Sequence, residues 1–212
     1  MSAMISLDGI QNIIFDFGGV LFEIDYDLPA QAFDDLGFTG FRDLYTQAAQ
    51  NPMFDLLETG KVANDAFLDF LHQHVPHATR EQVIHAWNVI LLRILPQEVE
   101  FVHALRKSGT RTFLLSNTNA IHVAEFEQMI TNTMDVRVFR EAFEKIYYSN
   151  AIGLKKPHPE TFLEVCAWNG LNPSETLFID DSKQHVEGAL RAGLHAYHLL
   201  PGERVSELLR NP

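Results

Sequence analysis

Short apolar runs of strand length recur along the chain, separated by longer stretches whose apolar positions follow a helical spacing. We predict β-strands at Ile13–Phe15, Thr112–Leu115, Ile146–Tyr148, Leu177–Ile179 and His195–Leu200. We predict helices around the later runs at Glu98–Lys107, Pro159–Trp168, Lys183–Ala192 and Glu203–Leu209. Buried strands that alternate with helices are typical of a parallel sheet covered on both faces, so we expect an α/β fold.

The stretch between the first two predicted strands differs, because it contains amphipathic helical patterns and no convincing strand. We predict helices there at Pro29–Leu36, Phe41–Ala49, Asn64–His74 and Thr79–Ile94. Thr79 and Gln82 have the spacing of a capping box, which marks the start of a helix. We therefore expect a core of residues 1–24 and 95–212, with a helical subdomain of residues 25–94 inserted after the first strand.

Composition and charge narrow the class of protein without identifying its activity. A chain of 212 residues with 46% hydrophobic and 21% charged residues is an ordinary globular sequence of one to two domains. A formal net charge of −12 disfavours nucleic acid and anionic membranes as partners. The N-terminus lacks the basic and apolar regions of a signal peptide, and no apolar run approaches the roughly 20 residues that span a bilayer. The single cysteine, Cys166, allows no internal disulfide, and we expect a cytoplasmic protein.

Residues that carry chemistry follow three of the predicted strands directly. They are Asp16 after the first strand, Ser116 and Asn117 after the second, and Asp180 and Asp181 after the fourth. A loop bounded by Gly153 and Pro157 adds Lys155 and Lys156. The carboxyl ends of parallel strands share one edge of a sheet, where ligands gather. Carboxylates, a hydroxyl, an amide and a lysine at this edge suit a hard divalent cation together with an anionic substrate.

A carboxylate at Asp16 can act as a nucleophile toward phosphorus and split a difficult hydrolysis into two easier steps. Gly18 and its neighbour Gly19 let the backbone bend sharply and bring a carbonyl close to a metal. We expect Asp180 and Asp181 to complete an oxygen-ligand site for Mg²⁺. The cation is needed because the carboxylate nucleophile and the phosphate are both negatively charged. Each residue alone has a plainer interpretation, because an aspartate after a strand is usually a turn or helix cap.

Three further residues are candidates for holding a phosphoryl group. Ser116 and Asn117 can donate hydrogen bonds to phosphoryl oxygens, and Lys156 supplies a fixed positive charge. In isolation these residues are equally well explained as a helix cap and a solvated loop. These residues follow in order along the chain, at the ends of predicted strands or in the loop between two of them. This arrangement favours a role in binding a phosphoryl group.

Four sequence motifs resemble those of the haloacid dehalogenase-like hydrolase superfamily. They are Asp16-Phe-Gly-Gly-Val-Leu, Ser116-Asn117, Lys156-Pro157 and Asp180-Asp181-Ser182. The resemblance runs from about Ile13 to the C-terminus, and the inserted helical segment is similar to the small cap of that family. The stretch from Ser116 to His122 is similar to the branch that contains bacterial α-D-glucose-1-phosphate phosphatases.

The resemblance implies a Rossmann-like core and a Mg²⁺-dependent hydrolysis of a small phosphorylated metabolite, such as a sugar phosphate, through an aspartyl-phosphate. By motif, Asp16 is the nucleophile and a metal ligand, and the carbonyl of Gly18 is a further ligand. Asp181 stands where the family places its metal carboxylate, and Asp180 either binds directly or supports it. Lys156, immediately before the proline, is a better match than Lys155. The resemblance implies no particular oligomeric state.

One position departs from the phosphatase pattern. A second aspartate two residues after the nucleophile usually serves as general acid and base, and here that position is Gly18. Losing such a group costs about 10²–10⁴ in rate. The similar glucose-1-phosphatase branch also has glycine at this position. Glu23 and Asp25 are candidates for a replacement, each with a surface or hinge role as the alternative.

Two other functions remain open. The first is metal-independent hydrolysis of a 2-haloacid, which calls for an arginine near the nucleophile; Arg42 is the first arginine after Asp16. The second is a catalytically weak or inactive module that binds phosphate or a partner, an idea that rests on Gly18. The adjacent carboxylates Asp180 and Asp181 argue against both.

Other residues suggest sites less strongly. His72, His74 and His77 resemble a metal cluster, but residues two apart on a helix face different ways, so we expect a solvated surface. His122 is a candidate for substrate contact, with the surface of a helix as the alternative. Cys166 lies on the apolar side of its predicted helix, and we expect it in the core.

Overall fold

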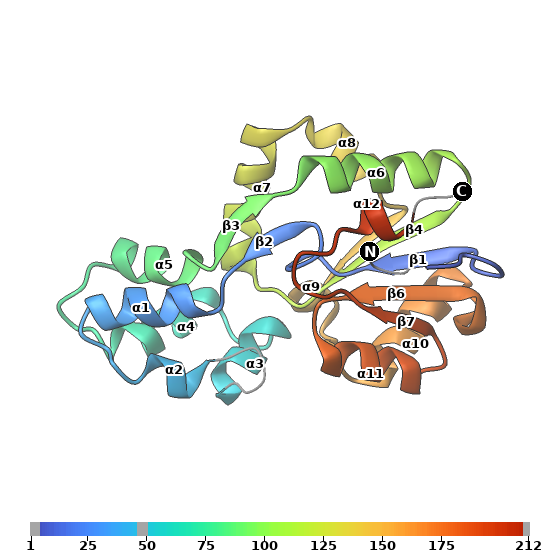
Figure 1. Ribbon diagram of the computed structural model, residues 1–212. Coiled ribbons are helices and arrows are strands. Elements are labelled where there is room, and N and C mark those ends of the chain that lie inside the picture. The colour runs from blue at the N-terminus through green and yellow to red at the C-terminus, as the bar shows by residue number, and fades with distance from the viewer. Residues whose placement is uncertain (1–4, 46–50, 210–212) are drawn as a thin grey trace.

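A five-stranded parallel sheet forms the centre of the computed structural model, which describes residues 5–45 and 51–209. Its strands lie in the order β5-β4-β1-β6-β7 (Figure 1). They are β1 (Asn12–Phe15), β4 (Arg111–Ser116), β5 (Lys145–Tyr148), β6 (Thr176–Asp180) and β7 (His195–His198). The predicted α/β fold is confirmed, and each of these strands overlaps one of the five predicted apolar runs.

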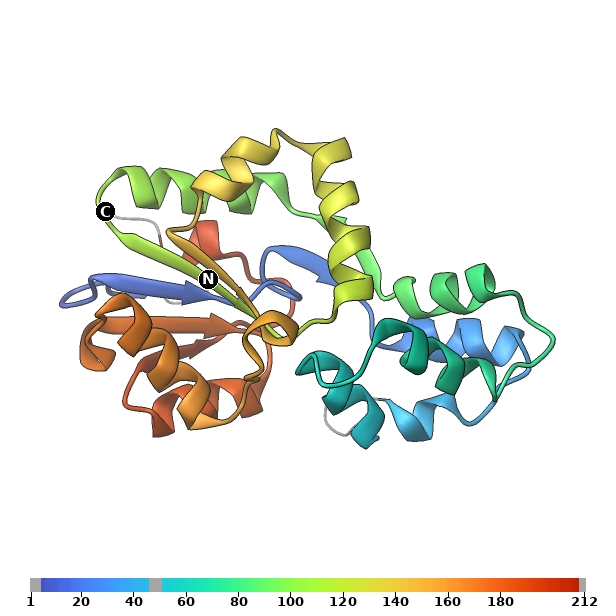
Figure 2. The same ribbon diagram turned by 180° about the vertical axis from the view of Figure 1, so that it is seen from behind.

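Helices cover both faces of this sheet (Figures 1 and 2). One face carries α6 (Pro96–Lys107), α7 (Ala120–Thr133), α8 (Val136–Glu141) and α12 (Val205–Leu208). The other face carries α10 (Pro159–Asn169) and α11 (Lys183–Arg191). Alternate residues of β1 explain why two layers form: Ile13 and Phe15 pack on the first side, and Ile14 packs on the second. Cys166 is buried in the second layer, as expected.

A two-stranded antiparallel sheet links the core to the helical segment. Its strands are β2 (Phe22–Ile24) and β3 (Leu91–Ile94). The prediction of a helix over Thr79–Ile94 and of no strand in this region is therefore wrong at its C-terminal end. Helix α5 stops at Asn88, and the following residues pair with β2. Pairing with a segment about 70 residues away in the chain overrides the local helical spacing, since an unpaired β2 would leave its backbone groups without partners.

The segment between these two strands consists of helices that share a hydrophobic core of their own. They are α1 (Asp27–Asp35), α2 (Phe41–Leu44), α3 (Pro52–Glu58), α4 (Asn64–His72) and α5 (Arg80–Asn88). The capping box of Thr79 and Gln82 is present, as predicted. The division of the chain into residues 1–24 and 95–212 on one side and 25–94 on the other stays a prediction.

The helix predicted over Phe41–Ala49 is shorter in the structure. It ends at Leu44, because Tyr45 has an extended backbone, and the predicted residues 46–49 lie outside the described residues. Helix α3 was not predicted, although Asn51 caps it by accepting a hydrogen bond from the backbone N–H of Met53 at 3.0 Å. In the described ranges, no helix combines the length and the apolar character needed to cross a membrane.

Candidate active site

The ends of three adjacent strands bring the predicted site residues to one edge of the sheet. Strand β1 lies between β4 and β6, so Asp16, Ser116 and Asp180 leave neighbouring strands at the same level. The backbone N–H of Asp16 donates to the carbonyl of Ile179 at 2.9 Å, which extends the pairing of β1 with β6 up to the site. All three side chains are buried.

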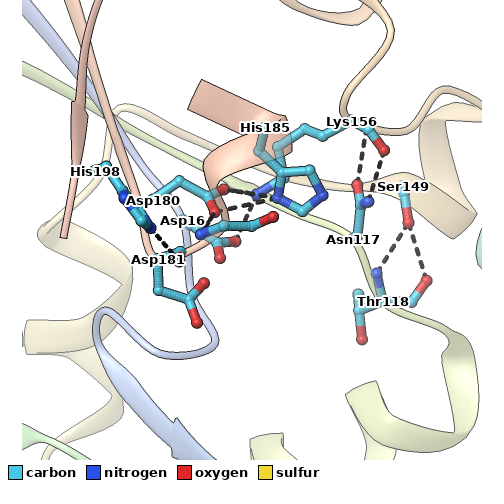
Figure 3. A network of polar contacts seen from close by, with 10 residues as sticks. Asp16, Asn117, Thr118, Ser149, Lys156, Asp180, Asp181, His185 and His198 are labelled. Atoms are coloured by element: carbon cyan, nitrogen blue, oxygen red, sulfur yellow. Dashed lines mark hydrogen bonds and ion pairs between the residues drawn. The ribbon is translucent and has the colours of Figure 1, made fainter. Parts of the chain in front are cut away.

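Lys156 lies between two of the carboxylates (Figure 3). Its Nζ atom is 2.7 Å from Oδ1 of Asp16 and 2.7 Å from Oδ2 of Asp180. The lysine is 0% exposed, so both ion pairs stand in a medium of low dielectric constant. Its neighbour Lys155 points elsewhere and pairs with Asp55 of α3. The two lysines of the loop therefore have different surroundings, and the catalytic role of Lys156 stays a prediction.

Asp16, Asp180 and Asp181 form a cluster in which one oxygen of each carboxylate lies within 4.8 Å of the others. Burial and the charge of Asp180 raise the pKa of Asp16 to about 6, against the opposing effect of Lys156. Burial and the charges of Asp16 and Asp180 raise the pKa of Asp181 to about 7. Three carboxylates exceed the one buried ammonium in charge, and a divalent cation would relieve this repulsion.

Asp180 has a different environment from the other two carboxylates. Burial would raise the pKa of Asp180, but Lys156 and His185 outweigh it and lower the pKa to about 2. Oδ1 of Asp180 also accepts a hydrogen bond from the backbone N–H of Ser182 at 2.7 Å, and Nδ1 of His185 lies 3.0 Å from Oδ2. Asp180 is therefore an ionised anchor whose oxygens already have partners. Sequence reasoning missed His185, which reaches the site from the first turns of α11.

Gly19 is required by both backbone geometry and space. Its φ of +75° lies in the left-handed region, and a Cβ atom there would stand 2.3 Å from Oδ2 of Asp181. A Cβ atom on Gly18 would stand 2.8 Å from Cδ1 of Ile24, so a hydrophobic side chain fills the space next to the position of the absent acid. The expected role of the Gly18 carbonyl as a metal ligand stays a prediction.

Asn117 holds the lysine loop in place. Its side-chain Nδ2 donates to the carbonyl of Lys156 at 2.9 Å, and its Oδ1 accepts from the N–H of Lys156 at 3.0 Å. Next to it, Ser149 of α9 (Ser149–Ile152) exchanges hydrogen bonds with both backbone groups of Thr118. The geometry therefore gives the Asn117 side chain a positioning role, whereas its direct contact with phosphate stays a prediction.

A pocket of about 290 Å³ opens over the carboxylate cluster, between the sheet edge and the helical segment. Its core side includes Asp16, Gly18, Ser116, Asn117, Thr118, Lys156, Asp181 and His185. Its other side includes Ile24, Tyr26, Tyr45, Asp55, Glu58 and Ile90. Sequence reasoning identified no residue of this second group, because helical periodicity marks apolar faces and not the few polar groups that face a cavity.

The proposed substitutes for the missing acid lie elsewhere. Neither Glu23 nor Asp25 is among the residues that line the pocket. Glu23 forms ion pairs with Arg93 and Arg204, and Asp25 accepts a hydrogen bond from the N–H of Asp27 at the start of α1. Both therefore have the hinge and surface roles that were the alternative. Arg42 likewise pairs with Asp27 and does not line the pocket.

His122 is buried, so its placement on the surface of a helix is wrong. Asn119, which caps α7, donates from Nδ2 to Nδ1 of His122 at 3.0 Å. Nε2 of His122 therefore carries the proton and donates to the carbonyl of Trp87 at 3.3 Å. Burial lowers the pKa of His122 to about 4, so the ring is neutral and joins α7 to the helical segment.

His72, His74 and His77 do not form a cluster that could hold a metal ion. Nε2 of His72 bonds to the carbonyl of Ala78, and the ring of His74 stacks on Phe38. Over the described part of the chain, the group of side chains that could hold a metal ion is the aspartate cluster.

Known proteins share this fold and sequence. Residues 10–193 match the family described as haloacid dehalogenase-like hydrolase. The D-ribitol-5-phosphate phosphatase of Bacteroides thetaiotaomicron is 31% identical over 189 residues, which is 89% of this chain and 91% of that protein. A HAD family enzyme of the same species, crystallised as an aspartate-to-alanine mutant with magnesium and inorganic phosphate, has a TM-score of 0.85 at 30% identity and covers 95% of this chain and 100% of its own.

A more distant likeness shows the fold alone. The L-2-haloacid dehalogenase of Xanthobacter autotrophicus has a TM-score of 0.59 at 19% identity, over 90% of this chain and 77% of that one. The narrower resemblance to glucose-1-phosphate phosphatases stays a prediction. The family match over most of the chain, on a sheet whose edge gathers the four motifs, leads to one conclusion: the protein belongs to the haloacid dehalogenase-like hydrolases.

Proposed function

We propose that the protein is a Mg²⁺-dependent phosphomonoester hydrolase that acts on a small phosphorylated metabolite such as a sugar phosphate. The observation that carries the proposal is the cluster of Asp16, Asp180 and Asp181 around the buried Lys156. The similar D-ribitol-5-phosphate phosphatase and the similar enzyme crystallised with magnesium and phosphate support it.

The residues at the sheet edge suit a two-step transfer through Asp16. An oxygen of Asp16 attacks phosphorus, the bond from phosphorus to the leaving oxygen breaks, and that oxygen takes up a proton from water. Water then attacks the phosphorus of the aspartyl-phosphate, releases inorganic phosphate and restores the carboxylate. Lys156 holds Asp16 in position and offsets negative charge as it builds up, and Ser116 is placed to donate to a phosphoryl oxygen.

The carboxylates fit a hard cation such as Mg²⁺, which would supply a Lewis acid that offsets the charges of the nucleophile and the phosphate. We assign Asp16 and Asp181 as ligands, with the carbonyl of Gly18. Asp180 already binds Lys156, His185 and a backbone N–H, which favours a supporting role for it.

The remaining assignments follow from this site. We propose that residues 25–94 act as a cap, because Tyr45, Glu58 and Ile90 form a wall of the pocket over the site. A net charge of −12 supports a small phosphate ester over a polyanion as partner. A single, buried cysteine supports a cytoplasmic location.

Removing the metal should abolish phosphate release. With an aryl phosphate as substrate, we expect excess EDTA to lower the rate about 100-fold or more and added Mg²⁺ to restore it. The measurement is inorganic phosphate released over time by the purified protein. Halide release from 2-chloropropionate that persists in EDTA would instead support the dehalogenase alternative. Tight binding of vanadate without turnover of any ester would support the inactive module.

Stabilisation by Mg²⁺ should increase with pH. The pKa values of Asp16 and Asp181, about 6 and about 7, lie above their value of 3.8 in an unfolded chain. The protonated forms of these two carboxyls therefore stabilise the metal-free folded protein fully below about pH 4. This stabilisation is lost as the pH rises through 6 to 7 and the carboxyls ionise. Protons compete with the cation over the same interval. We expect the rise in Tm caused by Mg²⁺ to be small at pH 5 and larger at pH 8.

His122 affects the Tm in the opposite direction, because its lowered pKa makes it destabilise the folded protein as the pH falls. This effect is the same with and without Mg²⁺, so it cancels when the two Tm values are subtracted. Replacing Asp181 with asparagine should reduce the Mg²⁺-induced rise in Tm and flatten its dependence on pH. An equal rise at pH 5 and pH 8 in the unmodified protein would contradict the assignment.

A further inference from the structure

The wall of the pocket opposite the carboxylate cluster carries polar groups that the hydrolysis itself does not use. Tyr26 precedes α1, Tyr45 follows α2, and Glu58 ends α3. These residues come from three separate parts of the helical segment and face one cavity. A phosphate held at Asp16 would direct the rest of its ester toward them.

Tyr45 places a phenol on this wall while most of its ring is buried. The residue is 5% exposed, and its ring packs on Phe54 and Trp87 at centroid distances of 4.9 Å each. Tyr45 lines the pocket, and its hydroxyl is not among the fully buried polar atoms of the described residues that lack a hydrogen-bond partner. Tyr26, whose ring lies 6.0 Å from that of Tyr45, adds a second phenol to the same side. A ligand that offers hydroxyl groups can form hydrogen bonds with both phenols.

The charges on this wall are not suited to an anionic group. Glu58 is 6% exposed, and its Oε2 lies 2.6 Å from Nζ of Lys155. The same ammonium is 2.6 Å from Oδ1 of Asp55, so two carboxylates share one cation. A carboxylate on the substrate would enter a pocket whose wall already holds the carboxylates of Asp55 and Glu58, next to the aspartate cluster. A neutral hydroxyl can donate to a carboxylate and accept from a phenol.

The phenols keep their protons at every working pH. Burial, together with the charge of Glu58, raises the pKa of Tyr45 well above its usual range. Burial and the neighbouring Tyr45 do the same for Tyr26, with Asp181 and Asp16 adding to the effect. Both hydroxyls are therefore O–H groups that can donate and accept.

We propose that Tyr26, Tyr45 and Glu58 form a subsite that binds the neutral, polyhydroxylated tail of the phosphate ester and disfavours a carboxylated tail. The proposal rests on the proposed phosphatase function and adds to it the class of substrate: a polyol or sugar phosphate. The three are specificity-determining residues, since they contact the part of the substrate that does not react.

Three alkyl phosphates test the subsite on the full chain with Mg²⁺. Ribitol 5-phosphate carries hydroxyl groups, pentyl phosphate has the same carbon chain without them, and phosphoglycolate carries a carboxylate. We expect kcat/KM for ribitol 5-phosphate to exceed that for each of the others by at least about 10-fold. Replacing Tyr45 with phenylalanine keeps the ring and should lower kcat/KM for ribitol 5-phosphate by about 3- to 10-fold, mostly through KM. The rate on pentyl phosphate, which has no hydroxyl group to bond to Tyr45, should fall by a smaller factor.

Two further variants sharpen the test. Glu58→Gln removes the negative charge and should narrow the preference for ribitol 5-phosphate over phosphoglycolate. Tyr147→Phe is the matched control, because this hydroxyl bonds to Asn169 outside the pocket and its loss should leave the ratio of substrates unaltered. Circular dichroism and Tm show whether each variant is folded.

The proposed subsite and the proposed phosphatase function are contradicted by different results. If the unmodified protein hydrolyses an aryl phosphate but prefers pentyl phosphate or phosphoglycolate, or if Tyr45→Phe affects all esters equally, the subsite is wrong and the phosphatase function stands. If no ester is hydrolysed in Mg²⁺, the proposed function is wrong and the subsite with it.

Discussion

Replacing Asp16 with asparagine should remove phosphate release almost completely while leaving the protein folded. Asparagine keeps the shape of the side chain but cannot form the aspartyl-phosphate, so we expect kcat to fall by at least about 10³-fold. Oδ1 of the asparagine can still accept a hydrogen bond from Lys156, as Asp16 does at 2.7 Å. The measurement is phosphate release in saturating Mg²⁺ for both proteins.

The same substitution should have the opposite effect on stability. The raised pKa of Asp16 means that its ionised form is disfavoured in the folded, metal-free protein. In EDTA at pH 8 we therefore expect the Tm of Asp16→Asn to equal or exceed that of the unmodified protein. Asp34→Asn, a change at an exposed residue that does not line the pocket, is the control and should alter neither quantity. Equal turnover by Asp16→Asn and the unmodified protein would remove Asp16 from its role.

Replacing Lys156 with methionine should lower both activity and stability. Methionine fills similar space but leaves Asp16 and Asp180 without the cation that both contact at 2.7 Å. Leaving a buried charge uncompensated costs roughly 3–5 kcal/mol. For a chain of this size that corresponds to a fall in Tm of roughly 6–20 °C, and we expect a loss in kcat of about 10²-fold or more.

The dependence on pH and metal separates this explanation from a simple packing defect. The loss of stability of Lys156→Met should be larger at pH 8 than at pH 5, because protonation relieves the unpaired carboxyls, and Mg²⁺ should restore part of it. Lys183→Met removes a lysine whose side chain is 79% exposed and should change the stability by no more than about 0.5 kcal/mol. A loss for Lys156→Met that is the same at both pH values and unaffected by Mg²⁺ would contradict the electrostatic account.

Much of the fold and the central residues of the site could be predicted because they depend on local patterns. The apolar runs that become β1, β4 and β6 are recognisable one at a time, and parallel pairing then places the residues after them at one edge. Asp16, Ser116 and Asp180 are brought together for that reason. The family, the α/β fold and the hydrolase class were predicted from the same segments and are confirmed by the comparisons.

Other features depend on partners that are distant along the chain. Strand β3 exists because β2 pairs with it, and the helical spacing before it contained no sign of that pairing. His185 acts on Asp180 from α11, and Asn117 binds the peptide of Lys156 across 39 positions of the sequence. Each of these residues taken alone is an ordinary polar residue on a helix or in a loop.

The opposite wall of the pocket illustrates the same limit. Tyr45 and Glu58 lie in amphipathic stretches where an aromatic or acidic residue has many possible places, and only packing turns both toward one cavity. The sequence by itself determined the five strands of the parallel sheet, the edge at which the chemistry gathers and the family, because strand periodicity and short motifs are local. Only the tertiary structure decided which groups hold Lys156, set the charge of Asp180 and line the pocket, because these depend on contacts and on burial between distant segments.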